Sequence, residues 1–120
     1  MYERVGGEQW FVDLVERFYD GVVDDQVLRP MYPDDLTGSK AHLAGFLVQY
    51  WGGPATYSEQ RGHPRLRMRH APFAIGPAKA QAWLAHMTAA VQAGGLGPQD
   101  ADQMLAYFEM AANHLLNHPG

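Results

Sequence analysis

Residues 8–25 read EQWFVDLVERFYDGVVDD, and their apolar residues recur as adjacent pairs about every four positions. The pairs are Trp10–Phe11, Leu14–Val15, Phe18–Tyr19 and Val22–Val23. Such pairs form a broad apolar stripe along one side of an α-helix, whereas a half-buried strand would alternate apolar and polar residues. This stretch therefore predicts an amphipathic helix whose apolar side faces a core.

Three further stretches have a helical period: residues 39–54, 76–95 and 98–118. Thr37 or Ser39 can cap the start of the first of them. Pro77 suits the first turn of the second, and Gly94 is expected to end it. Residues 26–38 hold two prolines and can form only a short helical turn. The pattern predicts an all-α fold.

The composition predicts one globular domain over residues 1–120, located in the cytoplasm. The chain is 47% hydrophobic and 18% charged, which fits a packed core rather than a disordered chain. It has no cysteine, which excludes disulfides and thiolate metal sites. It has no apolar run long enough to span a membrane, and no secretory signal pattern. Its net charge of −4 argues against nucleic acid as a partner.

The central stretch GHPRLRMRHAPF, residues 62–73, concentrates positive charge in an acidic chain. Between residues 60 and 99 there is no Asp or Glu, so an anion would fit this segment, although a solvated basic face is the alternative. The alternation of Leu66, Met68 and His70 with arginines resembles a strand, but no other strand is predicted to pair with it. We therefore expect one or two helical turns between Pro64 and Pro72.

His70 lies on the apolar side of that segment and has two interpretations. It is either a packed core residue or the ligand of a cofactor. Haem needs an imidazole on its iron, an apolar slot and cations for two propionates, and this segment offers all three. The alternative is a haem-free helical interaction domain whose arginines bind an acidic partner. Elsewhere, His114 and His118 are four residues apart but have no third metal ligand near them in sequence.

Three aromatic residues with hydrogen-bond donors lie on otherwise apolar stretches: Tyr19, Tyr32 and Trp83. Buried Tyr and Trp usually find a partner for their polar atom, and most such residues are ordinary core aromatics. If they met over a haem, their donors would face a bound diatomic ligand.

The stretches RFYDGV, RPMYPDDL, FLVQYWGGPATYSEQRGHPRLRMRHAPF and AWLAHM closely resemble group II truncated haemoglobins of actinobacteria. The resemblance extends over nearly the whole chain, to EMAANHLLNHP near its end. It implies a truncated globin, which is a two-over-two helical sandwich around haem. The pairs Gly6-Gly7 and Gly52-Gly53 match the paired glycines that shorten or bend the connections in that family.

The same resemblance implies roles for individual residues. His70 falls on the proximal histidine, and Tyr19, Tyr32 and Trp83 fall on the distal polar residues. Other expected haem contacts are Ser39 at the distal gate, Leu43 and Phe46 on the distal wall, and Leu66, Met68 and Phe73 on the proximal side. His42 stands where relatives often have an arginine that meets a propionate, so Arg67 and Tyr57 are expected to take that contact.

The resemblance implies a haem b protein that binds O2, CO, NO or other small iron ligands. Its candidate tasks are O2 binding or transport, O2 sensing, NO detoxification and peroxidase-type oxidation. A reductase is an expected partner for the reactions that consume electrons, and a homodimer or larger homo-oligomer is an expected state.

Overall fold

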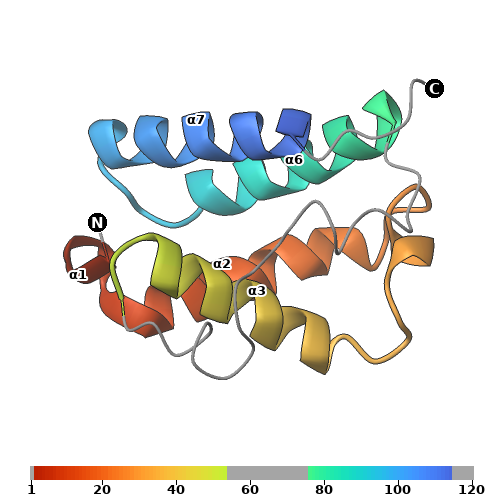
Figure 1. Ribbon diagram of the computed structural model, residues 1–120, viewed down its shortest axis with the longest axis horizontal. Coiled ribbons are helices and arrows are strands. Elements are labelled where there is room, and N and C mark those ends of the chain that lie inside the picture. The colour runs from red at the N-terminus through yellow and green to blue at the C-terminus, as the bar shows by residue number, and fades with distance from the viewer. Residues whose placement is uncertain (1, 54–75, 115–120) are drawn as a thin grey trace.

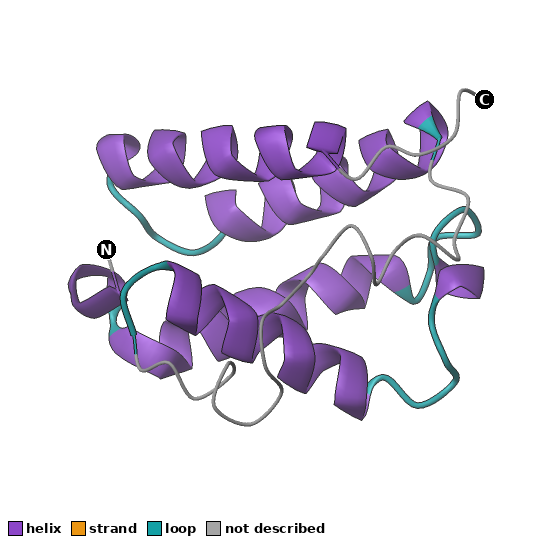
Figure 2. Ribbon diagram, viewed as in Figure 1, coloured by secondary structure: helices purple, strands orange, loops and turns teal. Residues whose placement is uncertain are grey.

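The structure is a computed structural model that describes residues 2–53 and 76–114. Within these ranges the regular elements are helices and there is no strand (Figure 2). The elements are α1 (Tyr2–Val5), α2 (Gly7–Val22), the 3-10 turn η1 (Arg29–Met31), α3 (Thr37–Tyr50), α6 (Pro77–Gln92) and α7 (Pro98–His114). The predicted all-α class is confirmed.

The long helices form two layers, α2 with α3 and α6 with α7 (Figure 1). Helix α2 contacts both its neighbour α3 and helix α6 of the other layer. This is the expected two-over-two arrangement. None of the described helices is both long enough and apolar enough to cross a membrane.

Helix α2 provides much of the core. The residues that it buries are Phe11, Leu14, Val15, Phe18, Tyr19 and Val22. Full burial of a large apolar side chain contributes roughly 1.5–3 kcal/mol, so this side of α2 holds the two layers together. The predicted stripe extends one residue too far, because α2 ends at Val22 and Val23 is 46% exposed.

The two glycine pairs lie where the chain turns sharply. Gly6, Gly7 and Gly52 have φ angles of 122°, 72° and 105°, in the region that side chains other than glycine rarely adopt. A Cβ atom on Gly53 would lie 2.8 Å from the carbonyl oxygen of Val48, too close for any other residue. These glycines allow α1 to fold back onto the end of α3, where the Tyr2 N–H donates to the Trp51 carbonyl at 3.0 Å.

Two details of the helix boundaries differ from prediction. The prediction that Thr37 or Ser39 caps α3 is wrong, because Leu36 occupies the cap position without a side-chain bond. Instead the Asp35 carboxylate accepts a hydrogen bond from the Thr37 N–H at 3.0 Å. The four-residue helix α1 was not predicted, since it is too short to show a period. The predicted short turn within residues 26–38 is confirmed as η1.

Candidate functional site

Two of the predicted distal residues, Tyr19 and Tyr32, are in contact. Tyr19 comes from the last turns of α2 and is 4% exposed, while Tyr32 follows η1 in an extended conformation. Their ring centroids are 5.4 Å apart, edge to face, with an interplanar angle of 84°. Their hydroxyl groups are hydrogen-bonding partners, and this contact is a minor influence beside burial on the pKa of each. A phenol hydroxyl can both donate and accept, so either tyrosine can be the donor.

Burial keeps both hydroxyls protonated. It raises the pKa of Tyr32 to about 12, and it raises the pKa of Tyr19 further, with the nearby Tyr32 adding to the shift. A phenolate would lose its hydration in this apolar setting, so the neutral phenol is favoured. At neutral pH the pair is therefore a source of O–H donors. Because two hydroxyls need only one O–H for the bond between them, the other O–H of the pair is left for a further acceptor.

Trp83 joins this pair through one intervening ring. Phe18 contacts Tyr19 at a centroid distance of 5.0 Å and contacts Trp83 at 5.7 Å, both edge to face. Trp83 also packs against Phe108 of α7 at 5.8 Å. The indole is half-buried, and within residues 2–53 and 76–114 its N–H has no hydrogen-bond acceptor. The structure thus brings the three predicted distal residues into one aromatic cluster.

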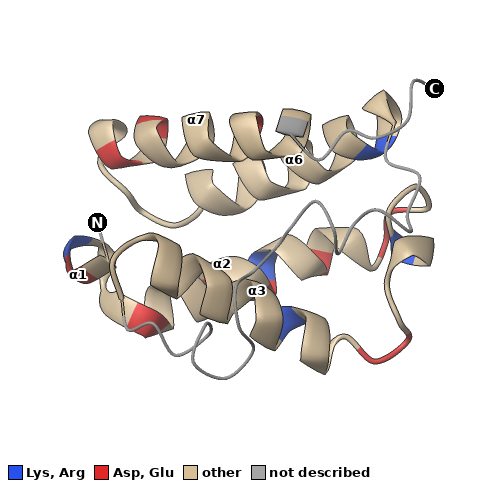
Figure 3. Ribbon diagram, viewed as in Figure 1, with Lys and Arg blue, Asp and Glu red and all other residues tan. Residues whose placement is uncertain are grey.

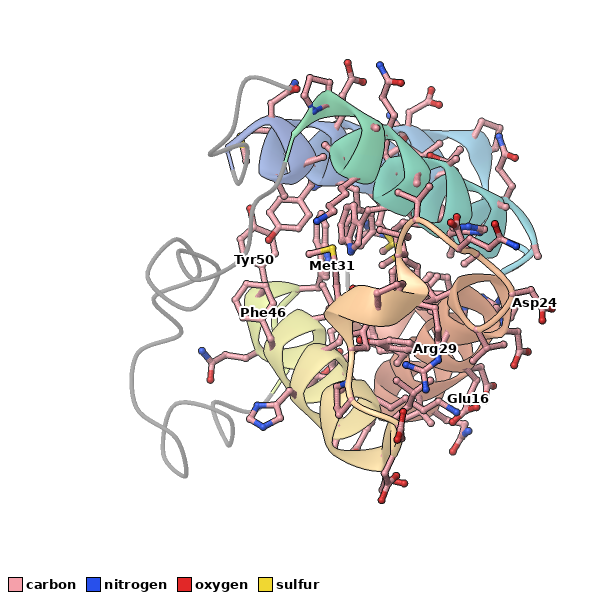
Figure 4. The ribbon with its side chains drawn as sticks, turned by 90° about the vertical axis from the view of Figure 1, so that its right-hand side faces the viewer. Glu16, Asp24, Arg29, Met31, Phe46 and Tyr50 are labelled. Atoms are coloured by element: carbon pink, nitrogen blue, oxygen red, sulfur yellow. The ribbon has the colours of Figure 1, made fainter. Side chains whose placement is uncertain are left out.

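Arg29 holds the backbone that carries Tyr32. Its guanidinium donates to three successive carbonyl oxygens, those of Tyr32 at 3.1 Å, Pro33 at 3.0 Å and Asp34 at 3.1 Å. A planar guanidinium suits such a task because its five N–H donors point in fixed directions. Arg29, labelled in Figure 4, therefore holds the backbone from Tyr32 to Asp34.

Helix α3 presents an apolar face beside this cluster. Ser39, Leu43, Phe46 and Tyr50 are spaced four, three and four residues apart, so they share one side of the helix. The first three are half-buried and Tyr50 is 49% exposed. Helices α3 and α6 each carry one Lys or Arg and no Asp or Glu, with Lys40 and Lys79 both near the helix start (Figure 3).

These residues fit one side of a flat apolar cofactor. The α3 face is apolar yet only partly covered by the described residues, and the rings of Phe46 and Tyr50 lie on it with centroids 6.1 Å apart (Figure 4). The Tyr32 hydroxyl and the Trp83 N–H supply donors beside that face. Within the described ranges no group of three His, Asp or Glu side chains could hold a metal ion directly.

The remaining predicted site residues lie outside the described residues. They are His70, its predicted proximal neighbours Leu66, Met68 and Phe73, and the predicted propionate contacts Arg67 and Tyr57. The helical turns expected between Pro64 and Pro72 also lie there. Their roles remain predictions.

Three residues near the site were missed by the sequence analysis. Arg29 was not singled out because its acceptors are backbone carbonyls, which leave no signal in a sequence. Asp25 and His86 are 61 residues apart and bond to each other at 2.6 Å, between the His86 Nε2 and the Asp25 Oδ2. The Asp25 carboxylate has a lowered pKa, chiefly because of this bond. No motif linked the two residues.

Known proteins provide an independent comparison. Residues 1–117 match the family described as Bacterial-like globin. The chain is 40% identical over 116 residues to the group 2 truncated haemoglobin YjbI of Bacillus subtilis (strain 168), covering 97% of this chain and 87% of that one. It is also 34% identical to the group 2 truncated haemoglobin 3-1 of Lotus japonicus, covering 98% and 75% of the two chains.

Solved structures agree with these sequence matches. A thermostable haemoglobin from the actinobacterium Thermobifida fusca is 52% identical and superposes with a TM-score of 0.96 over 99% of this chain and 98% of that one. The group II truncated haemoglobin of Bacillus anthracis is 40% identical, with a TM-score of 0.95 over 99% and 97% of the two chains.

A family match over nearly the whole chain agrees with the helical arrangement. Membership of this family implies binding of haem and of small diatomic ligands. The chain belongs to the Bacterial-like globin family, among the group II truncated haemoglobins.

Proposed function

We propose that this chain holds haem b through His70 and binds O2, with CO and NO as further ligands. The observation that carries the proposal is the pair of donors on the distal side. The Tyr19–Tyr32 pair and the Trp83 indole lie in one aromatic cluster; one O–H of the pair is left for a further acceptor, and the Trp83 N–H has none among the described residues. Half-buried donors normally find a partner, so a ligand that accepts hydrogen bonds fits this site.

The haem supplies an iron with an open coordination position for a diatomic ligand. The chain supplies the surroundings. Tyr32 and Trp83 donate hydrogen bonds to the ligand, and the contact with Tyr19 orients the Tyr32 hydroxyl. An indole N–H donates and cannot accept, so it favours a ligand that carries partial negative charge. These hydrogen bonds should therefore slow the release of O2 more than the release of CO.

The other contacts complete the proposed haem site. Leu43 and Phe46 would line the distal wall, with Ser39 at its gate. On the other side, Leu66, Met68 and Phe73 would pack around the macrocycle. Arg67 and Tyr57 would bind a propionate.

The task in the cell is proposed among four candidates: O2 binding or transport, sensing, NO detoxification and peroxidase-type oxidation. The last two consume electrons, so they would need a reductase as partner. We further propose a cytoplasmic protein that forms a homodimer or a larger homo-oligomer, a state that sedimentation velocity at several protein concentrations would measure.

Absorption spectra of the purified protein test the haem proposal. We expect a Soret band that shifts between the ferric, ferrous and CO-bound forms. His70→Ala should bind haem poorly and lose the signature of five-coordinate histidine-ligated iron, whereas the control variants His42→Ala and His63→Ala should keep it. Loss of the signature in a control but not in His70→Ala would contradict the assignment. A chain that takes up no haem would favour the haem-free interaction domain.

A further inference from the structure

A bond between His86 and Asp25 joins the middle of α6 to the turn that follows α2. The His86 Nε2 lies 2.6 Å from the Asp25 Oδ2, and the two side chains are 28% and 17% exposed. Beneath the imidazole lies Gly21 of α2. A Cβ atom added at Gly21 would run into the His86 Nδ1 and would lie 3.1 Å from its Cε1. Only glycine at this position leaves room for the ring.

Asp25 organises the segment that leads to Tyr32. Its Oδ1 accepts hydrogen bonds from the N–H groups of Val27 at 2.8 Å and Leu28 at 3.3 Å. Its backbone carbonyl accepts from the Arg29 N–H at 2.8 Å. Leu28 is 1% exposed and so anchors this turn in the core. The position of Asp25 thus determines where η1 begins, and Tyr32 directly follows η1.

His86 is correspondingly close to Trp83. The two residues are three apart on α6, so their side chains are neighbours along the helix. On α2, Phe18 and Gly21 are also three apart, and they contact Trp83 and His86 respectively. A displacement of α6 at His86 would therefore change how Trp83 packs on Phe18.

We propose that His86 is a positioning residue of the distal site: bonded to Asp25 and seated on Gly21, it sets the place of Trp83 relative to Tyr32. The inference rests on the proposed function, because these two donors matter only when a ligand lies between them. His86 itself touches neither the ligand nor either donor; it acts through the α6 backbone and through the turn that Asp25 holds.

Three substitutions perturb this contact in different ways. His86→Phe keeps a ring of similar size but removes the bond to Asp25. Gly21→Ala leaves both partners intact and pushes the imidazole away. Asp25→Ser keeps a hydroxyl that can accept from the Val27 N–H but is too short to reach His86. As a rescue, His86→Gln can still hydrogen bond to the Asp25 carboxylate. Asp100→Asn is the control, because it removes the charge from the Arg4–Asp100 ion pair, 2.7 Å long and between α1 and α7.

The readouts are the infrared C–O stretch of the CO complex and the O2 dissociation rate of the haem-loaded protein. All three perturbing variants should shift or broaden the C–O stretch and change the O2 dissociation rate by about threefold, as expected for a weakened hydrogen bond. His86→Gln and Asp100→Asn should match wild type. A lower melting temperature with an unchanged stretch and rate in all three variants would overturn the proposal, and so would an equal effect in Asp100→Asn.

A second measurement needs no haem. In an amide and indole nitrogen–proton correlation spectrum of the haem-free protein, His86→Phe and Gly21→Ala should move the Trp83 indole cross-peak and leave that of Trp10 in place. If wild type takes up no haem and the Trp83 peak still moves, the proposed function fails while the positioning contact stands. If neither variant moves the Trp83 peak, the positioning proposal fails, whatever the haem experiments give.

Discussion

The tryptophans at the two ends of helix α2, Trp10 of α2 itself and Trp83 of α6, use their hydrogen-bond donors differently. Near its start, Trp10 packs edge to face on Phe11 at 5.1 Å, and its indole N–H donates to the Gly94 carbonyl at 2.9 Å. Near its end, Phe18 packs on Trp83, whose N–H has no acceptor within the part of the chain that the structure describes. The first indole is satisfied within the fold, whereas the second is the donor that we propose for a bound ligand.

By this difference, the contacts of Trp10 stabilise the fold, whereas Trp83 belongs to the candidate site. The Trp10 N–H bonds to the carbonyl of Gly94, just beyond the end of α6. The Arg17 Nε donates at 3.0 Å to the carbonyl of Ala90, in the last turn of α6. Carbonyls at a helix end have no partner within the helix, so both bonds satisfy groups that need one. These bonds join α2 to the end of α6. At the other end of α2, the described residues form no such bond through the Trp83 indole.

The largest expected effect is on the free energy of unfolding, at the start of α2 where Trp10 lies. A Cβ atom on Gly94 would lie 2.7 Å from the Trp10 Cζ2 and 3.2 Å from the Val91 carbonyl. Gly94→Ala must displace the indole, so it should lower the free energy of unfolding by about 1–3 kcal/mol, as is usual for overpacking. Urea denaturation of wild type and variant measures this. The O2 dissociation rate should stay within about twofold of wild type; a larger change would mean that the two ends of α2 are not independent.

The next effect concerns the donors of the site. Each hydrogen bond to bound O2 should contribute about 1–2 kcal/mol, so Trp83→Phe/Tyr32→Phe should release O2 tenfold faster or more. CO release should change much less, because CO accepts hydrogen bonds weakly. Stopped-flow dissociation measures both rates, and the single variants show whether one donor replaces the other.

Trp10→Phe is the matched control for that experiment. It also removes one indole N–H, but from a bond to the backbone, so it should lower stability and leave the O2 dissociation rate unchanged. If the double variant holds O2 as long as wild type does, Tyr32 and Trp83 are only core aromatics, and the contrast between the two ends of α2 loses its functional meaning.

Local patterns predicted most of the fold. The paired apolar residues of α2 and the glycine and proline boundaries of the other helices depend on neighbours in the chain, which a sequence displays. The contacts that bring Tyr19, Tyr32 and Trp83 together join three separate segments, and only the family resemblance pointed to them. The bonds of Arg29 to backbone carbonyls and of His86 to Asp25 have no sequence pattern, because they depend on how the turns pack.

A smaller effect should appear at alkaline pH. Burial raises the pKa of Tyr32 from its usual value near 10 to about 12. Between these values the folded chain keeps a proton that the unfolded chain has lost, so stability falls as pH rises through this range and is unaffected below it. For one such group the loss is on the order of 1 kcal/mol per pH unit. Urea denaturation at pH 9, 10 and 11 should show a shallower decline for Tyr32→Phe.

Part of the loss of stability at alkaline pH should remain in Tyr32→Phe. Burial also raises the pKa of Tyr107 to about 12, so Tyr107→Phe should flatten the decline as well. Deprotonation of either buried tyrosine lowers the stability of the fold for the same reason. Only the substitution of Tyr32 is expected to change the rate of O2 release. Equal declines in wild type and Tyr32→Phe would show that the Tyr32 hydroxyl is already exposed to water in the folded chain.

The smallest expected effect tests whether the orientation of the Tyr32 hydroxyl depends on the backbone that Arg29 holds. Arg29→Met removes the donors to the carbonyls of Tyr32, Pro33 and Asp34 while keeping an apolar stem of similar length. The Tyr32 hydroxyl would still be present but less well oriented, so O2 release should be about threefold faster, less than after its removal. Arg29→Lys can reach only some of these carbonyls and should give an intermediate rate.

Hydrogen exchange separates this explanation from a general loss of stability. The Tyr32 N–H donates to the Arg29 carbonyl at 3.2 Å within the held segment, so its exchange should accelerate in Arg29→Met while that of the α6 amides does not. Arg4→Met is the control, since Arg4 is also paired but lies far along the chain from Tyr32. An unchanged O2 rate together with faster Tyr32 exchange would mean that Tyr19 alone orients the Tyr32 hydroxyl. The ring contact and hydrogen bond between the two tyrosines would then be enough to hold the donor, without the backbone contacts of Arg29.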